Sequence, residues 1–342
     1  MDVKRFLALL LCLLFLAASA SAETLSFGAV SADKRADYID MAEEKVADWP
    51  AFISFLQEFP NLTRVDMFST QVTEKEVAML EEALPAVEFG WTLQLMKYKD
   101  KHIVRTDATY FSTRHGFCPN HRSEEFALLR YAKSLLALDL GHNNLTDISF
   151  LRNMPNLRVL ILGENQKLKN VGELAALQDL EYLELFTCGI RDITPLTKLT
   201  KLMDLNLGNN QVEDWRPLKE MTWLKRLWIP GMTAHGMSNA DLQELQEALP
   251  DTVIMAERRF VSNPTGNGWR YYSDYKADKA ADNLVPHYAV IKEMMEEDAY
   301  IPFAESAPLE EEEDHPEDVY MVTDVDPAGL DDTAADPAEN NP

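Results

Sequence analysis

Three residues in one short loop have the side-chain types and the spacing of a metal site. His115, Cys118 and His121 follow one another with H-x₂-C-x₂-H spacing. Neutral imidazoles and a thiolate are ligands that zinc prefers, so this loop is a candidate zinc site. The sequence offers no second Cys-x₂-Cys or His-x₃-His pair to complete it, and Gly116 and Pro119 favour the alternative of a polar turn. Both interpretations stay open.

Cys188 is the other side chain with possible chemistry, and it lies near the end of LEYLELFTCGI, residues 180–190. The sequence has neither a Gly-x-Ser-x-Gly nucleophile elbow nor a glycine-rich phosphate loop. The chain has 57 acidic residues against 32 basic ones, so carboxylates close together in the sequence are expected by chance and do not indicate a catalytic site. We therefore predict that the chain is not an enzyme and holds no cofactor. The role of Cys188 must come from the elements around it.

The first 22 residues are typical of a secretory signal peptide. Lys4 and Arg5 precede an apolar run at residues 6–18, and Ala20-Ser21-Ala22 offers a cleavage site. The run is short for a membrane span. We expect cleavage after Ala22 and a secreted, extracellular chain. Removal of the signal leaves two cysteines, too few for a disulfide framework, so the fold must depend on its hydrophobic core.

The C-terminal residues 304–342 have a different composition from the rest of the chain. They contain 14 acidic residues, no Lys or Arg, and five prolines. A segment of this kind repels itself and has little to bury, which predicts a disordered acidic tail. The net charge of −25 argues against a nucleic-acid partner. We also expect a monomer with no membrane insertion after signal cleavage.

A repeat with a period of 22 or 23 residues runs through the middle of the chain. Its template is L-x-x-L-x-L-x-x-N-x-L, and its copies start at Leu135, Leu157, Leu180, Leu202 and Leu224. The L-x-L part predicts a short strand whose leucines enter the core, and stacked copies predict a parallel sheet. After each strand, apolar residues recur at every third position, which favours a 3₁₀ or extended convex side over an α-helix.

The asparagine of the template also turns inward, where its amide can hydrogen-bond the backbone of neighbouring turns. This position is held by Asn143, Asn165 and Asn210 in three copies. In the copy that starts at Leu180 it is held by Cys188. We therefore expect the Cys188 thiol to be packed in the core and unreactive.

Weaker repeat units flank the regular ones. Residues 76–89 and 241–254 share a near-identical helical pattern, as expected of units that cover the end faces of a solenoid. Residues 102–112 predict a strand. The aromatic-rich residues 268–303 are expected to pack on the last turn.

Residues 123–135 predict a helix with Ser123 as its N-cap and Phe126, Leu129 and Ala132 facing the core.

The stretches NNLTDISFLRNMPNL and GIRDITPLTKLTKL resemble the leucine-rich repeat family, in the short-repeat, internalin-like class of bacterial secreted proteins. The expected fold is an α/β leucine-rich repeat solenoid with a parallel sheet on the concave face, a 3₁₀ or extended convex side, and helical caps at both ends. The predicted divisions are a signal peptide (1–22), an N-terminal cap with irregular repeats (23–134), regular repeats (135–232), a C-terminal helical repeat and cap (233–303), and the acidic tail (304–342).

The side chains between the leucines of each strand should form columns on the concave face. In the later repeats these columns bring aromatic residues together with an arginine and carboxylates, and Trp, Tyr and Arg often dominate binding energies. We expect an exposed ligand-binding patch there. Its predicted members are Asp139, His142, Tyr182, Glu184, Phe186, Asp204, Asn206, Arg226 and Trp228.

The sequence therefore predicts an exported module that binds a protein or peptide through its concave face and has no catalytic activity. One alternative is a metal-dependent enzyme or zinc-stabilised domain built on His115, Cys118 and His121. Another is a structural spacer in an envelope assembly with no specific ligand.

Overall fold

The structure is a computed structural model, and it describes residues 23–95, 103–113, 120–231, 236–256 and 291–303 except 292 and 295. The predicted signal peptide and acidic tail lie outside the described residues. Among the helices that are described, none is long and apolar enough to cross a membrane.

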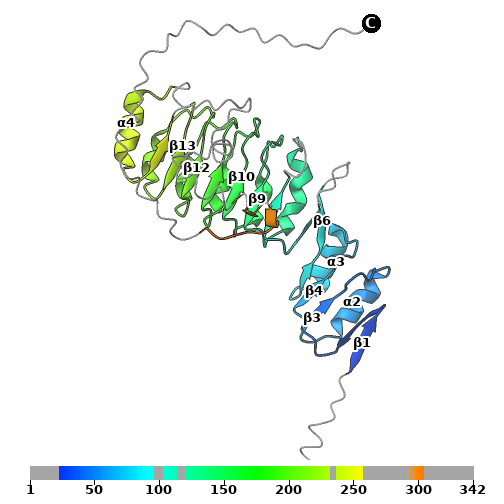
Figure 1. The fold of residues 1–342 in the computed structure, drawn as a ribbon. Helices are drawn as coiled ribbons and strands as arrows, with labels where there is room; N and C mark the ends of the chain where they lie inside the picture. Colours follow the sequence, from blue (N-terminus) through cyan, green and yellow to red (C-terminus); the bar gives the residue numbers. More distant parts are fainter. Residues whose placement is uncertain are drawn as a thin grey trace, which may run out of the picture. The chain divides into compact units, whose positions relative to one another are not determined.

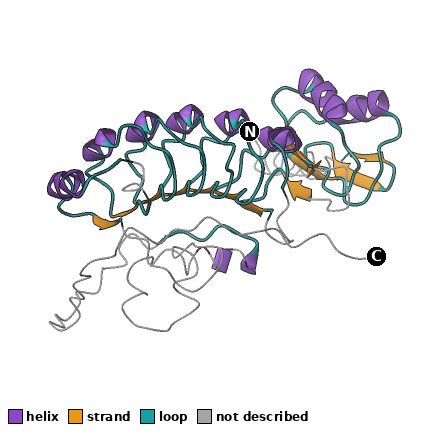
Figure 2. Cartoon of the chain, turned by 90° about the horizontal axis from the view of Figure 1, so that it is seen from above, coloured by secondary structure: helices purple, strands orange, loops and turns teal. Residues whose placement is uncertain are grey.

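A seven-stranded parallel sheet runs along one side of the repeat region (Figures 1 and 2). Its strands lie in chain order, and corresponding template positions lie side by side, as for Leu160, Leu183 and Leu205. In this order the strands are β8 (Tyr110–Ser112), β9 (Ala137–Asp139), β10 (Val159–Ile161), β11 (Tyr182–Glu184), β12 (Asp204–Asn206), β13 (Arg226–Trp228) and β14 (Val253–Met255).

Short 3₁₀ helices form the convex side of the regular repeats. They are η2 (Ser149–Asn153), η3 (Gly172–Ala176), η4 (Thr194–Lys198) and η5 (Arg216–Glu220). A 3₁₀ helix has three residues per turn, so apolar side chains three positions apart point the same way. Ile193, Leu196 and Leu199 illustrate this, because all three are buried. The predicted convex side is confirmed.

The asparagines of the template form a ladder inside the solenoid, as predicted. Asn165 is fully buried, and its Nδ2 donates to the carbonyl oxygens of Leu140 at 2.9 Å and Leu162 at 2.7 Å. Its Oδ1 accepts from the backbone N–H of Leu145 at 3.0 Å. Asn210 repeats this pattern, so each amide joins two consecutive turns.

Irregular repeat units precede the seven-stranded sheet. A three-stranded parallel sheet consists of β3 (Tyr38–Asp40), β4 (Arg64–Asp66) and β5 (Glu88–Gly90), with α2 (Trp49–Gln57) and α3 (Glu74–Ala83) between its strands. Two antiparallel hairpins flank it, β1 (Thr24–Phe27) with β2 (Val30–Asp33) and β6 (Thr92–Gln94) with β7 (Ile103–Arg105). Asp48 caps α2 by accepting from Ala51 N at 2.9 Å, and Thr73 and Glu76 form a capping box at α3.

At the other end of the seven-stranded sheet, α4 (Asn239–Ala248) precedes the edge strand β14. Ser238 and Asp241 form its capping box, and Leu245 and Leu249 pack into the core. The predicted helical units at both ends are confirmed.

Two local predictions were wrong. Residues 103–112 form two strands, β7 and β8, because a turn follows Arg105: Ala108 N donates to Arg105 O, and Asp107 pairs with the Arg105 guanidinium. Ser123 is not an N-cap. Its side chain lies at the first position of the 3₁₀ helix η1 (Ser123–Tyr131), and its hydroxyl oxygen accepts from two backbone N–H groups of the next repeat.

The inward face predicted for η1 is confirmed, since Phe126, Leu129 and Ala132 are fully buried.

Candidate interaction surface

The structure brings the predicted site residues together on the concave face of the seven-stranded sheet. Tyr182, Asp204 and Arg226 are direct neighbours across three strands, and Glu184, Asn206 and Trp228 form the adjacent row. Asp139 lies on β9 at the same template position as Glu184. His142 and Phe186 lie in the turns after β9 and β11.

The expectation that these side chains are exposed was wrong. Eight of the nine are buried, and His142 is half-buried. Trp228, the most exposed of the eight, retains 7% of its surface. Part of the cause is residues 291–303 of the same chain, which lie against the sheet (Figure 2). These residues are here called the covering segment. The sequence predicts packing of residues 268–303 on the last turn, and of these, residues 268–290 lie outside the described residues. The described part instead contacts Thr109 before β8 and Tyr182 on β11.

The covering segment shares an apolar cluster with the concave face. Its buried members are Ile291, Met294 and Phe303, and the Phe303 ring centre lies 6.1 Å from that of Tyr182. At the start of the sheet, the backbone N–H of Tyr300 donates to Thr109 Oγ1 at 3.2 Å. The strand residues of this cluster are Tyr110, Ala137, Val159, Ile161, Tyr182 and Trp228. The segment therefore contacts the sheet beside its first strand, through Tyr300, and at β11, through Phe303.

Charged side chains on the buried concave face are paired. Arg226 donates to both carboxylate oxygens of Asp204, with Nη2 2.9 Å from Oδ2 and a second bond from Nε to Oδ1. The Tyr182 hydroxyl donates to Glu184 Oε1 at 2.5 Å. A bidentate guanidinium–carboxylate pair is among the strongest polar contacts that a protein makes. Each charge thus offsets the cost of burying the other.

Other polar members of the predicted patch satisfy the local backbone. Asp139 Oδ1 accepts from Gly141 N at 2.9 Å, and Asn206 Oδ1 accepts from Gly208 N at 3.0 Å. Both side chains close the turn that follows their strand. His142 has a φ of 60° in that turn, a left-handed conformation that histidine adopts more readily than most residues.

Phe186 is buried for a different reason. A Cβ atom placed on Gly163 would lie 2.3 Å from the Phe186 ring, so the ring occupies the space that the missing side chain leaves in the preceding repeat. Phe186 is therefore packed against its neighbouring turn and is only 2% exposed.

The candidate zinc loop is only partly described. His115 and Cys118 lie outside the described residues, while His121 Nδ1 lies 2.9 Å from Glu125 Oε2. Within the described part of the chain, three or more His, Cys, Asp or Glu side chains nowhere gather as a metal site would need.

Cys188 is packed in the asparagine position of its repeat, as predicted. It is a free cysteine, 6% exposed, and its Sγ donates to the carbonyl oxygens of Leu162 at 3.4 Å and Phe186 at 3.7 Å. Burial in an apolar core disfavours the thiolate and raises the pKa of this thiol to about 12. A thiol of this kind is inert.

This pKa predicts how the Cys188 thiol affects stability at high pH. Below pH 9 the thiol keeps its proton in both states and has no effect. Above pH 9 the unfolded thiol ionises while the folded one does not, so the free energy of unfolding falls until pH 12, by about 4 kcal/mol. Urea unfolding of the chain and of Cys188→Ala, both carrying Cys118→Ser, isolates this effect as a difference in pH slope. Equal slopes between pH 9 and 11 would refute it.

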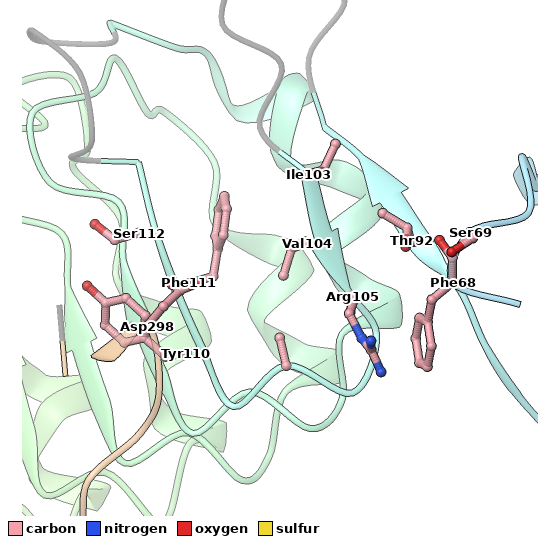
Figure 3. A pocket seen from close by; sticks show the side chains of 11 residues that line it. Phe68, Ser69, Thr92, Ile103, Val104, Arg105, Tyr110, Phe111, Ser112 and Asp298 are labelled. Atoms are coloured by element: carbon pink, nitrogen blue, oxygen red, sulfur yellow. Dashed lines mark hydrogen bonds between the residues drawn. The ribbon is translucent and has the colours of Figure 1, made fainter. Parts of the chain in front are cut away.

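A pocket of about 490 Å³ lies between the β6–β7 hairpin and β8 (Figure 3). Arg105 lines it with its guanidinium carbon 3.5 Å from the Phe68 ring centre, and Asp298 of the covering segment lines it as well. The hydrogen bond between Arg105 and Asp107 raises the pKa of the guanidinium and lowers that of the carboxyl. The Arg105 charge is therefore already compensated within the chain.

Sequence reasoning missed the covering segment as part of the site. The available signal was Ile291 and Met294, three residues apart among acidic neighbours and followed by Tyr300 and Phe303. This pattern is that of a short amphipathic helix with an aromatic extension.

The comparisons with known proteins match the repeats. A family model named "Leucine Rich repeats (2 copies)" matches residues 133–176. Leucine-rich repeat-containing protein 4C of Homo sapiens is 39% identical over 79 residues, which are 22% of this chain and 12% of that protein. Leucine-rich repeat-containing protein 4 of Rattus norvegicus is 38% identical over 80 residues, again 22% and 12%. The chain thus spans only a small part of the length of these relatives.

Two solved structures from Listeria monocytogenes are similar at low identity. The internalin inlF is 23% identical with a TM-score of 0.36, and the match covers 64% of this chain and 53% of the inlF chain. The internalin inlC2 is 21% identical with a TM-score of 0.33, and the match covers 64% of this chain and 80% of the inlC2 chain. The identification itself depends on the family model and on the observed sheet and convex turns. Residues 133–176 are leucine-rich repeats, and the chain is built on a leucine-rich repeat solenoid.

Proposed function

We propose that the chain is an exported, non-catalytic interaction module that binds a protein or peptide ligand on the concave face of its solenoid. The observation that carries this proposal is the packing of residues 291–303 on that face. A surface that seats one peptide of this length has the shape and the apolar side chains to seat another. Leucine-rich repeats are an interaction-type fold, which is consistent with such a role.

The composition of the concave face supports a peptide ligand. Tyr182 and Trp228 provide large apolar surface with polar edges, and Asp204 and Arg226 provide a charged pair beside them. Aromatic and arginine side chains of this kind dominate the energy of protein interfaces. Binding of a peptide by such a face requires no catalytic group.

Export is a proposal from the N-terminal residues. The basic start, the apolar run and the Ala20-Ser21-Ala22 site are arranged as in a cleaved signal peptide. A mature chain that begins at Glu23 in the culture medium would support secretion, and a cell-retained chain that still carries residues 1–22 would contradict it.

A displayed peptide library tests the binding face. Peptides selected on the mature wild-type chain should bind a Tyr182→Ala/Trp228→Ala variant at least tenfold more weakly, because the variant lacks the two aromatic anchors. Tyr38→Ala is the matched control, since Tyr38 is 46% exposed and lies on the separate three-stranded sheet. Thermal unfolding verifies that each variant is folded. Unchanged binding by the double variant would place the binding site elsewhere.

A further inference from the structure

We propose that residues 291–303 are an internal ligand of the concave face, and that the external ligand is a short amphipathic peptide that must displace them. This inference rests on the proposed binding role of the concave face and specifies the chemistry of the partner. The partner would present two aliphatic side chains one helical turn apart and an aromatic side chain further along, in the manner of Ile291, Met294 and Phe303.

The covering segment has the two-faced character of a bound peptide. Ile291, Met294 and Phe303 are buried in the cluster on the sheet, with Tyr300 and Ile301 partly buried beside them. The acidic side chains of Glu293, Glu296 and Glu297 are exposed, and Asp298, also exposed, lines the pocket beside β8. An apolar stripe against the sheet and charges toward solvent are the pattern by which amphipathic peptides bind grooves.

The cluster under the segment is separate from the core of the solenoid. The template leucines pack on the other side of the sheet, whereas Val159, Ile161 and Tyr182 pack with the segment. The two sets alternate along each strand, so they point to opposite faces. Removing the segment would therefore uncover a contiguous apolar surface without opening the core, and such surfaces mark interaction sites.

The described contacts between segment and sheet come chiefly from side chains. Among the described residues of 291–303, none forms a strand of the seven-stranded sheet, and the backbone of the segment contacts Thr109 through Tyr300 N. Exchange of this segment for another peptide would thus leave every strand pair of the sheet intact. The anchors that an incoming peptide must reproduce are the three buried side chains.

A ligand that competes with an internal segment binds with reduced apparent affinity. Its dissociation constant rises by the inverse of the fraction of molecules in which the face is open. If the segment occupies the face in nine molecules of ten or more, the wild-type chain binds an external copy at least tenfold more weakly than a chain whose segment is released.

Fluorescence anisotropy with a labelled synthetic peptide of residues 289–304 tests this competition. The peptide is titrated with the mature full-length chain and with a full-length Met294→Asp/Phe303→Asp variant, in which two buried anchors become charged. We expect the variant to bind the peptide at least tenfold more tightly than wild type. A peptide carrying aspartate in place of Ile291, Met294 and Phe303 should bind neither chain.

Two controls keep the outcome interpretable. Glu293→Ala/Glu297→Ala changes only exposed residues of the segment and should bind the peptide as weakly as wild type. If thermal unfolding shows that the double-aspartate variant is not folded, Phe303→Ala takes its place, with the same direction expected.

Equal binding of the peptide by wild type and variant, or no binding by either, would overturn the internal-ligand proposal. Library peptides that still depend on Tyr182 and Trp228 would then leave the proposed function standing. Conversely, tight binding of the 289–304 peptide only by the released variant, with library peptides insensitive to Tyr182→Ala/Trp228→Ala, would refute the proposed function alone.

Discussion

Arg226→Met is expected to lower the free energy of unfolding by about 3 kcal/mol. The guanidinium and the Asp204 carboxylate are paired on the concave face, with side chains 6% and 0% exposed. Methionine fills similar space but removes the positive charge that compensates Asp204, and a buried carboxylate is costly when its guanidinium is lost. Urea unfolding followed by circular dichroism measures the loss.

Two further variants test whether the uncompensated buried charge of Asp204 causes the loss of stability in Arg226→Met. Arg191→Met removes a similar cross-repeat ion pair with Glu213, but these side chains are 61% and 69% exposed, so the expected loss is below about 1 kcal/mol. The double variant Asp204→Leu/Arg226→Met should recover most of the stability, because it removes both charges together. A loss of less than about 1 kcal/mol for Arg226→Met alone would contradict the structure of this pair.

Asn165→Ala is expected to cost about 3 kcal/mol, an effect of similar size. The change removes two hydrogen bonds donated to Leu140 and Leu162 and one accepted from Leu145, all in the fully buried interior. A backbone group that loses its partner in the core stays buried away from water without a hydrogen bond, and this costs free energy. The same urea unfolding experiment measures the change.

Asn156→Ala is the matched control for Asn165→Ala. Its side chain is exposed and donates one hydrogen bond, at 3.3 Å, to the carbonyl oxygen of Lys133. Removing it should change the free energy of unfolding by less than about 0.5 kcal/mol. If both alanine variants unfold alike, the asparagine ladder does not hold consecutive turns together.

The sequence predicted the repeat core because each of its positions has one physical role. Leucines at the L-x-L positions must enter the core, and a step of three after each strand fits the three residues per turn of a 3₁₀ helix. The Asn165 position and its replacement by Cys188 followed from the same register. In the structure, that register places both side chains inside.

The state of the concave face could not be predicted from the same register. Successive side chains of a strand point to opposite faces of the sheet, which predicts the face to which Tyr182 points. The same rule does not predict which distant part of the chain packs against that face. Residues 291–303 belong to no repeat, so no periodicity linked them to β11. Phe186 was misjudged for a more local reason, because its burial depends on the absence of a side chain at Gly163 in another repeat.

The central claim is that residues 291–303 cover the concave face, and labelling of a single thiol tests it most directly. Val159 is 2% exposed, lies beside Tyr182 in the register and belongs to the covered cluster. Val159→Cys is introduced into the mature chain with Cys118→Ser, where the remaining Cys188 thiol is buried. Ile103→Cys, at a position 62% exposed, gives the rate of an open thiol.

We predict that a thiol reagent modifies Val159→Cys at least a hundredfold more slowly than Ile103→Cys. Adding Met294→Asp/Phe303→Asp should bring the two rates within about tenfold of each other, because the face is then open. Val159→Cys that reacts as fast as Ile103→Cys while the segment is intact would contradict the account.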